Sequence, residues 1–209
     1  PGGDQAVRHP ARLAWAYLRT LAPNEAERLD LGLGATERQV LEAMLARGVG
    51  TPWTSSAGRL FDAVSALLGV CREASYEAQA AIELEMIAQP SMSTEPYPFE
   101  IALAGAPQVW GKPPVTVTEG FEVRLAPLFE GILAERRQQA PLGAIAWRLH
   151  RTVAEMILQA CTRLREETGL ERVALSGGCF QNRLLLELTV PLLEAAGLKV
   201  LLHRQVPCN

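Results

Sequence analysis

The stretch Leu175-Ser176-Gly177-Gly178-Cys179-Phe180-Gln181-Asn182-Arg183 decides the fold of this chain. It follows a short apolar run at residues 172–175 and precedes a periodic apolar run that ends at Gly197. Two glycines between a strand and a helix let the backbone approach a ligand, because neither carries a Cβ. The N–H groups of such a turn and the helix dipole behind it favour anionic oxygens. A mere tight turn is the alternative that these residues alone leave open.

A long helix is predicted before this strand and a second strand after it. Apolar side chains recur at three- and four-residue steps from Ile145 to Leu164, and Gly169 closes the helix. Residues 199–202 form another apolar run. The order helix, strand, glycine turn, helix, strand predicts an α/β fold with parallel strands. Pro191 lies inside the second helix, residues 182–196, and should kink it or restart it.

The whole chain is expected to form one domain in three segments: a mainly helical segment at residues 1–90, a Pro-rich crossover at 91–140, and an α/β subdomain at 141–209. The form of a capping box at residues 36–39 predicts a helix start, with Val40, Ala43 and Met44 on its apolar face. A further helix is predicted at about residues 75–88. In the crossover, residues 99–103 and 121–125 alternate as strands do. A hairpin and a meandering crossover both remain open for them.

Composition narrows the classes of partner. The chain has 209 residues and a net charge of −3, without a basic stripe interleaved with aromatics, so nucleic acid is not expected. No apolar run approaches the roughly 20 residues that cross a bilayer. The first residues show no basic-then-apolar signal, and the start is expected to be an excised boundary of a cytoplasmic protein. The cysteines stand far apart and are expected to be buried or idle thiols: Cys71, Cys161, Cys179 and Cys208.

Four blocks of sequence together resemble one protein family. They are Pro1-Gly2-Gly3-Asp4 with Arg8, residues 54–64, residues 75–85, and residues 173–187 with 203–207. These blocks resemble the carbamoyltransferases of nickel–iron hydrogenase maturation, the HypF family, over nearly the whole chain. They are similar, more loosely, to the tRNA threonylcarbamoyl-adenosine transferases. The resemblance implies a truncated, helix-rich part of the actin/sugar-kinase/Hsp70-like, or ribonuclease H-like, nucleotide-binding α/β fold.

The resemblance also implies an activity. Such enzymes use ATP and carbamoyl phosphate, through an enzyme-bound carbamoyl-adenylate, to carbamoylate the C-terminal cysteine thiol of a partner protein in hydrogenase maturation. That group later becomes a cyanide ligand. An O-carbamoyltransferase of the same fold and a non-catalytic partner-docking domain are the alternatives. The family's divalent metal would be held by a histidine pair upstream of Pro1 and an Asp beyond Asn209, so we expect this chain alone to be metal-free and inactive.

Site residues follow from the same resemblance. Gly177 and Gly178 would approach the phosphates of ATP or carbamoyl-adenylate, with Ser176 in the same turn. Asn182 would bind the nucleotide through its amide. Asp62, which follows Phe61 in a Gly-Arg-Leu-Phe-Asp block, would contact the ribose. On the residues alone, an exposed helix carboxylate is the alternative for Asp62. No catalytic residue is assigned.

Two positions depart from the family pattern, and three residues keep an open role. Ala78 stands where the family has Gly, and its methyl would narrow a ribose pocket there. Cys179 stands where Val or Ile is usual, and we expect it to be core, not a nucleophile. His203 and Arg204 follow a strand, which suits either catalysis or a surface strand end. His150 is expected to be structural.

Overall fold

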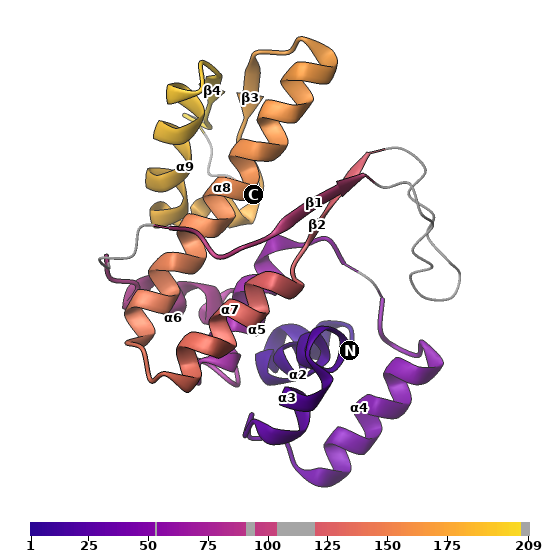
Figure 1. Cartoon of the computed structure of the whole chain (residues 1–209). Helices are drawn as coiled ribbons and strands as arrows, with labels where there is room; N and C mark the ends of the chain where they lie inside the picture. Colours follow the sequence, from indigo (N-terminus) through magenta and orange to yellow (C-terminus); the bar gives the residue numbers. More distant parts are fainter. Residues whose placement is uncertain (53, 91–94, 104–119, 206–209) are drawn as a thin grey trace.

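In the computed structural model the described residues are 1–52, 54–90, 95–103 and 120–205 (Figure 1). Helices fill the N-terminal part, and a helix-flanked pair of strands forms the C-terminal part. The elements are α1 (Asp4–Arg8), α2 (Pro10–Leu21), α3 (Pro23–Arg28), α4 (Ala35–Arg47), α5 (Ala57–Leu67), α6 (Gln79–Ile87), β1 (Glu100–Leu103), β2 (Phe121–Arg124), α7 (Ala126–Arg137), α8 (Leu142–Thr168), β3 (Arg172–Ala174), a 3-10 turn (Gly178–Gln181), α9 (Arg183–Ala195) and β4 (Lys199–Leu201).

Helix α5 lies at the centre of the main core. Every residue from Leu60 to Leu67 is buried, so this helix has no solvent face over that stretch. The apolar side of α2, with Trp15 and Leu18, packs in the same core cluster. Side chains of α6, α7, α8 and α9 complete it. Burial of each large aliphatic side chain contributes about 1.5–3 kcal/mol, so the helical part has a substantial apolar core.

The predicted long helix is confirmed as α8. It spans 27 residues and ends at Gly169, which takes the left-handed φ of 74°. Its buried stripe includes Ile145, Leu149 and Val153 in the main core. Further along, α8 packs against α9, and Figure 1 shows α9, β3 and β4 gathered beside its C-terminal half. One long helix therefore joins the helical core to the α/β part.

The strand predictions are confirmed. β3 and β4 pair in parallel, with Val173 opposite Val200. A small second core beneath them contains Leu175, Leu193 and Leu198. β1 and β2 pair antiparallel, which agrees with a hairpin and not with a meandering crossover. Pro191 does not break α9, which continues from Arg183–Ala195 around it.

Several local predictions are wrong. Helix α4 begins at Ala35 with Gly34 as its N-cap and has no side-chain capping bond, so the expected capping box does not form. Val40 is 53% exposed, and Leu41 is the residue that α4 buries. The 91–140 segment, expected to be a crossover with short strands, also contains α7, in which Pro127 occupies the first turn, where proline is tolerated. The three-segment division itself stays a prediction.

Helix α6 begins at Gln79 and not at about residue 75, so it is shorter than predicted. Tyr76 lies before the helix and is 52% exposed, so its side chain does not belong to the buried face of α6. The N-cap of α6 is Ala78, whose φ of 62° is left-handed. An L-residue with a Cβ is strained there, whereas glycine is not. The left-handed backbone here therefore favours glycine, the residue that the resemblance implies at this position.

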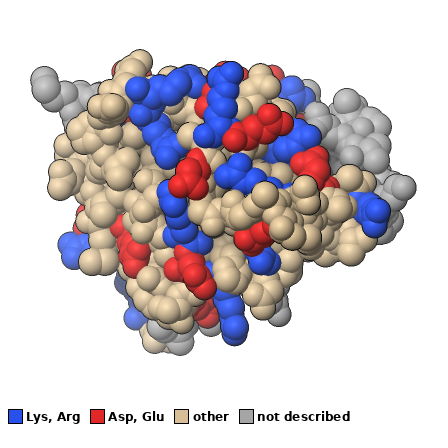
Figure 2. All heavy atoms as spheres, turned by 90° about the horizontal axis from the view of Figure 1, so that it is seen from below, with Lys and Arg blue, Asp and Glu red and all other residues tan. Residues whose placement is uncertain are grey.

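The charged surface mixes both signs. Figure 2 shows Lys and Arg side chains interspersed with Asp and Glu over the face seen from below. Several of these charges pair between helices, as Arg19 of α2 does with Glu42 of α4 at 2.7 Å. Among the described residues, no helix is both long and apolar enough to cross a membrane.

Candidate functional site

The glycine turn follows β3 directly and leaves open space beside it. Gly177 has φ 94° and ψ 158°, a conformation that glycine adopts without strain. Gly178 begins the 3-10 turn and lies outside the left-handed region. A Cβ built on either glycine would meet no described heavy atom within 4 Å. The space that a ligand would need beside both residues is therefore present.

Asn182 is the N-cap of α9, at the end of the same turn. Its Oδ1 accepts a hydrogen bond from the backbone N–H of Leu185 at 2.7 Å. Its Nδ2 lies 2.9 Å from Nε2 of His150. An amide side chain has two donor hydrogens and two acceptor lone pairs. The two hydrogen bonds described here use one of each. The nucleotide contact expected of Asn182 stays a prediction.

His150 lies on α8 and is completely buried. Burial lowers the pKa of this imidazole, so the ring is neutral near pH 7. Its Nδ1 lies 2.7 Å from the backbone oxygen of Ala146, an acceptor, which assigns the proton to Nδ1. Nε2 is then free to accept from the Asn182 amide. His150 is thus a structural residue, as expected, and it contacts the predicted site.

A carboxylate occupies the N-terminus of α9. Oε1 of Glu85, on α6, accepts from the backbone N–H of Leu184 at 3.0 Å. The sequence predicted that the dipole of this helix would favour a bound anion, and the structure places a carboxylate of the chain itself there. The sequence analysis missed Glu85 as a site residue. Its only signal was its place in the block at residues 75–85, because its partner lies 99 positions away.

Asp62 does not reach outward, so the orientation expected for it is wrong. It is 2% exposed and forms an ion pair with Arg59 at 2.9 Å. Burial raises the pKa of the Asp62 carboxyl to about 6, although Arg59 lowers it. The Asp62 oxygen nearest Arg59 lacks a well-aligned hydrogen bond among the described residues, so the pair is close but poorly directed. A ribose contact would require this side chain to leave its position, and it stays a prediction.

Cys179 connects the turn to the start of α5. A Cβ on Gly58 would lie 3.6 Å from Sγ of Cys179, so the Cys179 side chain lies close to the backbone of Gly58. The thiol is half-buried, and its burial raises its pKa above the usual value. A backbone hydrogen bond with Gly58 and the charge of Arg59 act in the opposite direction. The thiol is therefore protonated near pH 7, which agrees with a packing role and not with a nucleophile.

Ser176 and His203 meet at the carboxyl ends of the two parallel strands. Oγ of Ser176 lies 2.9 Å from Nε2 of His203, and both residues are exposed. Arg204 is exposed next to them. The carboxyl ends of parallel strands are where open α/β sheets bind ligands. The structure thus brings Ser176, Gly177 and Gly178 together with His203, while Asp62 lies in the core behind the turn.

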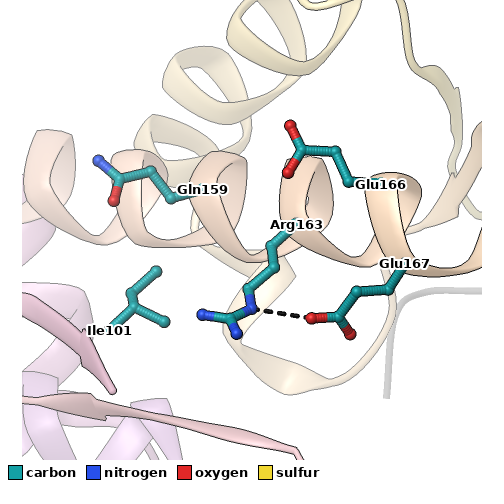
Figure 3. Close-up of a pocket in the computed structure, with 5 residues that line it drawn as sticks. All are labelled: Ile101, Gln159, Arg163, Glu166 and Glu167. Carbon is teal, nitrogen blue, oxygen red and sulfur yellow. Dashed lines mark hydrogen bonds and ion pairs between the residues drawn. The ribbon is translucent and has the colours of Figure 1, made fainter. Parts of the chain in front are cut away.

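Two open hollows are lined by residues outside this turn. Figure 3 shows a pocket of about 400 Å³ between β1 and α8. Its lining residues are Ile101, Gln159, Arg163, Glu166 and Glu167. Arg163 is paired with Glu167 at 2.9 Å, so the only cation among the described lining residues already has a carboxylate partner. A second hollow, of about 690 Å³, is lined mainly by apolar side chains that include Met86 and Leu142.

A complete metal site is not visible in the described part of the chain. There, no three His, Cys, Asp or Glu side chains lie close enough together to hold an ion. His150 is buried against Asn182, and His203 contacts Ser176. The described donors therefore do not fit a metal centre by themselves. The expectation that the chain alone is metal-free stays a prediction.

Comparisons with known proteins agree on one family. A family profile described as "Carbamoyltransferase, Kae1-like Domain, second subdomain" matches residues 1–209. Carbamoyltransferase HypF of Synechocystis sp. is 30% identical over all of this chain and 27% of its own length. The HypF of Rhodobacter capsulatus is 34% identical over all of this chain and 25% of its own length. A HypF homolog of Cupriavidus necator is 35% identical, and the match covers 51% of it.

Solved structures give the same relationship. The crystal structure of full-length HypF in a phosphate- and nucleotide-bound form superposes with a TM-score of 0.83 at 30% identity, covering all of this chain and 26% of that one. HypF of T. kodakarensis gives a TM-score of 0.74 at 25% identity, covering 97% of this chain and 26% of that one. The chain thus spans about a quarter of the length of most of these relatives. It belongs to the HypF carbamoyltransferase family and corresponds to the second subdomain of the Kae1-like domain.

Proposed function

We propose that this chain supplies one side of the nucleotide site of a carbamoyltransferase, in the form of the Gly177–Gly178 turn. The observation that carries the proposal is the position of the turn. It follows a parallel strand, with open space where a Cβ on either glycine would stand. A solved relative of the same fold is described as holding phosphate and nucleotide. At the finer level of fold, we assign the chain to the actin-like, ribonuclease H-like nucleotide-binding class.

The proposed reaction transfers a carbamoyl group from carbamoyl-adenylate, made with ATP and carbamoyl phosphate, to the thiol of an acceptor protein in hydrogenase maturation. The thiolate sulfur attacks the carbamoyl carbon, the bond from that carbon to the phosphate oxygen breaks, and AMP leaves with the electron pair. Backbone N–H groups at Gly177 and Gly178 would hold the phosphate by hydrogen bonds. The Ser176 hydroxyl, which lies 2.9 Å from Nε2 of His203, would add a polar contact to the same anion.

The divalent metal of such an enzyme finds no complete ligand set in the described part of this chain. What the chain contributes in this proposal is position: a fixed turn that orients the adenylate for attack. For the 209-residue chain alone, ATP should bind weakly, with a Kd of about 1 mM or weaker.

Calorimetric titration of the intact protein with ATP tests the proposal. Gly178→Val should abolish ATP binding and leave the fold intact, since the added side chain meets open space. Arg163→Gln, in the pocket of Figure 3, is the matched control and should bind ATP as the wild type does. ATP affinity that Gly178→Val leaves unchanged would remove the turn from the site. A protein that takes a thiol acceptor but no nucleotide would instead be a docking domain, and one that carbamoylates a hydroxyl would be an O-carbamoyltransferase.

A further inference from the structure

Two helices anchor the first turn of α9, which begins immediately after the glycine turn. From α6, Glu85 accepts the backbone N–H of Leu184 at 3.0 Å. From α8, His150 accepts from Asn182, the N-cap, at 2.9 Å. The N-cap of α9 and the second residue of the helix are therefore held by two other helices. A hydrogen bond to a charged group is about twice as strong as one between neutral groups.

The two anchors are part of one connected network. The Nδ1–H of His150 donates to Ala146 within α8, which fixes the imidazole ring. The ring also lies 4.9 Å, centroid to centroid, from that of Phe61 in α5. The two anchors meet at the first turn of α9, because Glu85 binds the backbone N–H of Leu184 and Asn182, which contacts His150, binds that of Leu185. With Nδ1–H bound to Ala146, the ring is oriented so that Nε2 faces Nδ2 of Asn182.

The anchored residues connect directly to the glycines. The backbone N–H of Asn182 donates to the Cys179 oxygen at 3.2 Å, and that of Phe180 donates to the Gly177 oxygen at 3.0 Å. The 3-10 turn therefore forms a short, hydrogen-bonded connection from the anchors to Gly177. A shift of the α9 N-terminus would move the glycine backbone with it.

We propose that Glu85 and His150 are positioning residues, which act through Leu184 and Asn182 to hold the Gly177–Gly178 turn in its ligand-binding orientation. The inference rests on the proposed nucleotide site and adds two residues to it that touch no ligand. It also separates two roles of Asn182: capping α9 through Oδ1, and joining α9 to α8 through Nδ2.

The test compares variants of the intact protein by ATP titration and by amide hydrogen exchange of peptides that cover residues 176–188. Glu85→Ala removes the acceptor for Leu184, whereas Glu85→Gln keeps one. Asn182→Asp keeps the capping oxygen but loses the donor to His150. Glu83→Ala is the control, because Glu83 lies on the same helix and its carboxylate accepts from Gln79.

We expect Glu85→Ala and Asn182→Asp to weaken ATP affinity roughly tenfold, the scale of one lost charged or network hydrogen bond. Exchange across the turn should be faster in both. Glu85→Gln should return affinity to within about twofold of wild type, and Glu83→Ala should change neither readout. Rescue by glutamine, with an unchanged melting temperature, separates positioning from a general loss of stability.

Each other outcome decides a specific point. Wild-type affinity and wild-type exchange in Asn182→Asp or Glu85→Ala would overturn the inference. If Glu85→Ala fails to fold, hydrogen exchange of residues 176–188 in Asn182→Asp decides it, since that variant keeps the capping oxygen and exchange without ATP does not depend on a nucleotide contact of Asn182. If the wild type binds no ATP, the proposed nucleotide site fails; exchange across the turn then shows on its own whether Glu85 and His150 anchor it.

Discussion

Gly131 lies against the ring of Tyr97 so closely that a Cβ at Gly131 would stand 2.7 Å from Cδ1 of the tyrosine. Tyr97 is 1% exposed, and its hydroxyl donates to the Glu135 carboxylate of α7. The guanidinium carbon of Arg148, on α8, lies 4.2 Å from the ring centroid on one face. The ring is therefore held between two helices, and the chain leading into β1 is fixed with it.

We expect Gly131→Ala to destabilise the protein by about 1–3 kcal/mol, because a well-packed aromatic ring has to move to admit the methyl group. The matched control is Gly58→Ala. There the nearest atom to the new Cβ, Oγ of Ser56, lies 3.5 Å away, and alanine is the better helix former. Thermal unfolding followed by circular dichroism measures both. Equal melting temperatures for the two variants would contradict the close packing of Gly131 against the Tyr97 ring.

Ala78→Gly should stabilise the protein by up to about 1 kcal/mol. Ala78 has a left-handed φ of 62°, a conformation that costs an L-residue about 1–2 kcal/mol and that glycine adopts freely. Part of the gain is lost to the greater entropy of glycine in the unfolded chain. Ala88→Gly is the control, because Ala88 has an ordinary φ of −62° and its replacement should destabilise. Chemical denaturation of both variants measures the change in unfolding free energy, which should rise for Ala78→Gly and fall for Ala88→Gly.

The two glycines of the turn should respond differently to alanine. Gly177 has φ 94°, so Gly177→Ala is expected to cost about 1 kcal/mol or more of folding stability. Gly178 lies outside the left-handed region and has open space around it, so Gly178→Ala should leave the melting temperature unchanged. Urea unfolding of both variants makes the comparison. A larger loss for Gly178→Ala would show that the described backbone of the turn is wrong.

The buried Asp62 should make stability depend on pH. Its folded-state pKa of about 6 lies above the unfolded value near 3.8, so the folded state holds its proton more tightly. The resulting stabilisation is fully present below about pH 4 and is lost as pH rises to about 6. It amounts to roughly 3 kcal/mol at most, at 1.36 kcal/mol for each pKa unit. The difference in unfolding free energy between wild type and Asp62→Asn, measured from pH 4 to 7, should fall by that order. A flat difference would contradict the raised pKa.

Local sequence patterns predicted the elements whose shape depends on near neighbours. The apolar side chains of α8 recur at helical spacing from Ile145, and a glycine marks where the helix ends. The parallel pairing of β3 and β4 was predicted from the alternation of helices and strands along the chain. Helix α7 was missed because residues 91–140 were predicted together as one Pro-rich crossover, although Pro127 occupies a first turn where proline fits. Such patterns describe the spacing of residues along the chain. They do not show that one position of a helix, its first turn, accepts proline.

The side chains of the site were harder to predict, because their partners come from distant elements. Asp62 was expected to face solvent, as one side of an amphipathic helix does, yet α5 is covered on all sides from Leu60 to Leu67. The sequence marked Gly177, Gly178 and Asn182 as one group, and they do lie in one turn. It offered no means to pair Glu85 with Leu184, since that contact depends on how α6 and α9 dock.

The bond from Glu85 to Leu184 also has a consequence for synthesis. Its two residues lie 99 positions apart, so at about 5–20 residues per second a ribosome adds Leu184 roughly 5–20 s after Glu85. Helices α6 and α8 are complete before α9 exists, and they have time to dock first. The glycine turn and α9 then fold onto a carboxylate and an imidazole already in place. During that interval the Glu85 carboxylate cannot accept a hydrogen bond from the backbone of α9. In a chain that ends before α9, this hydrogen bond would never form.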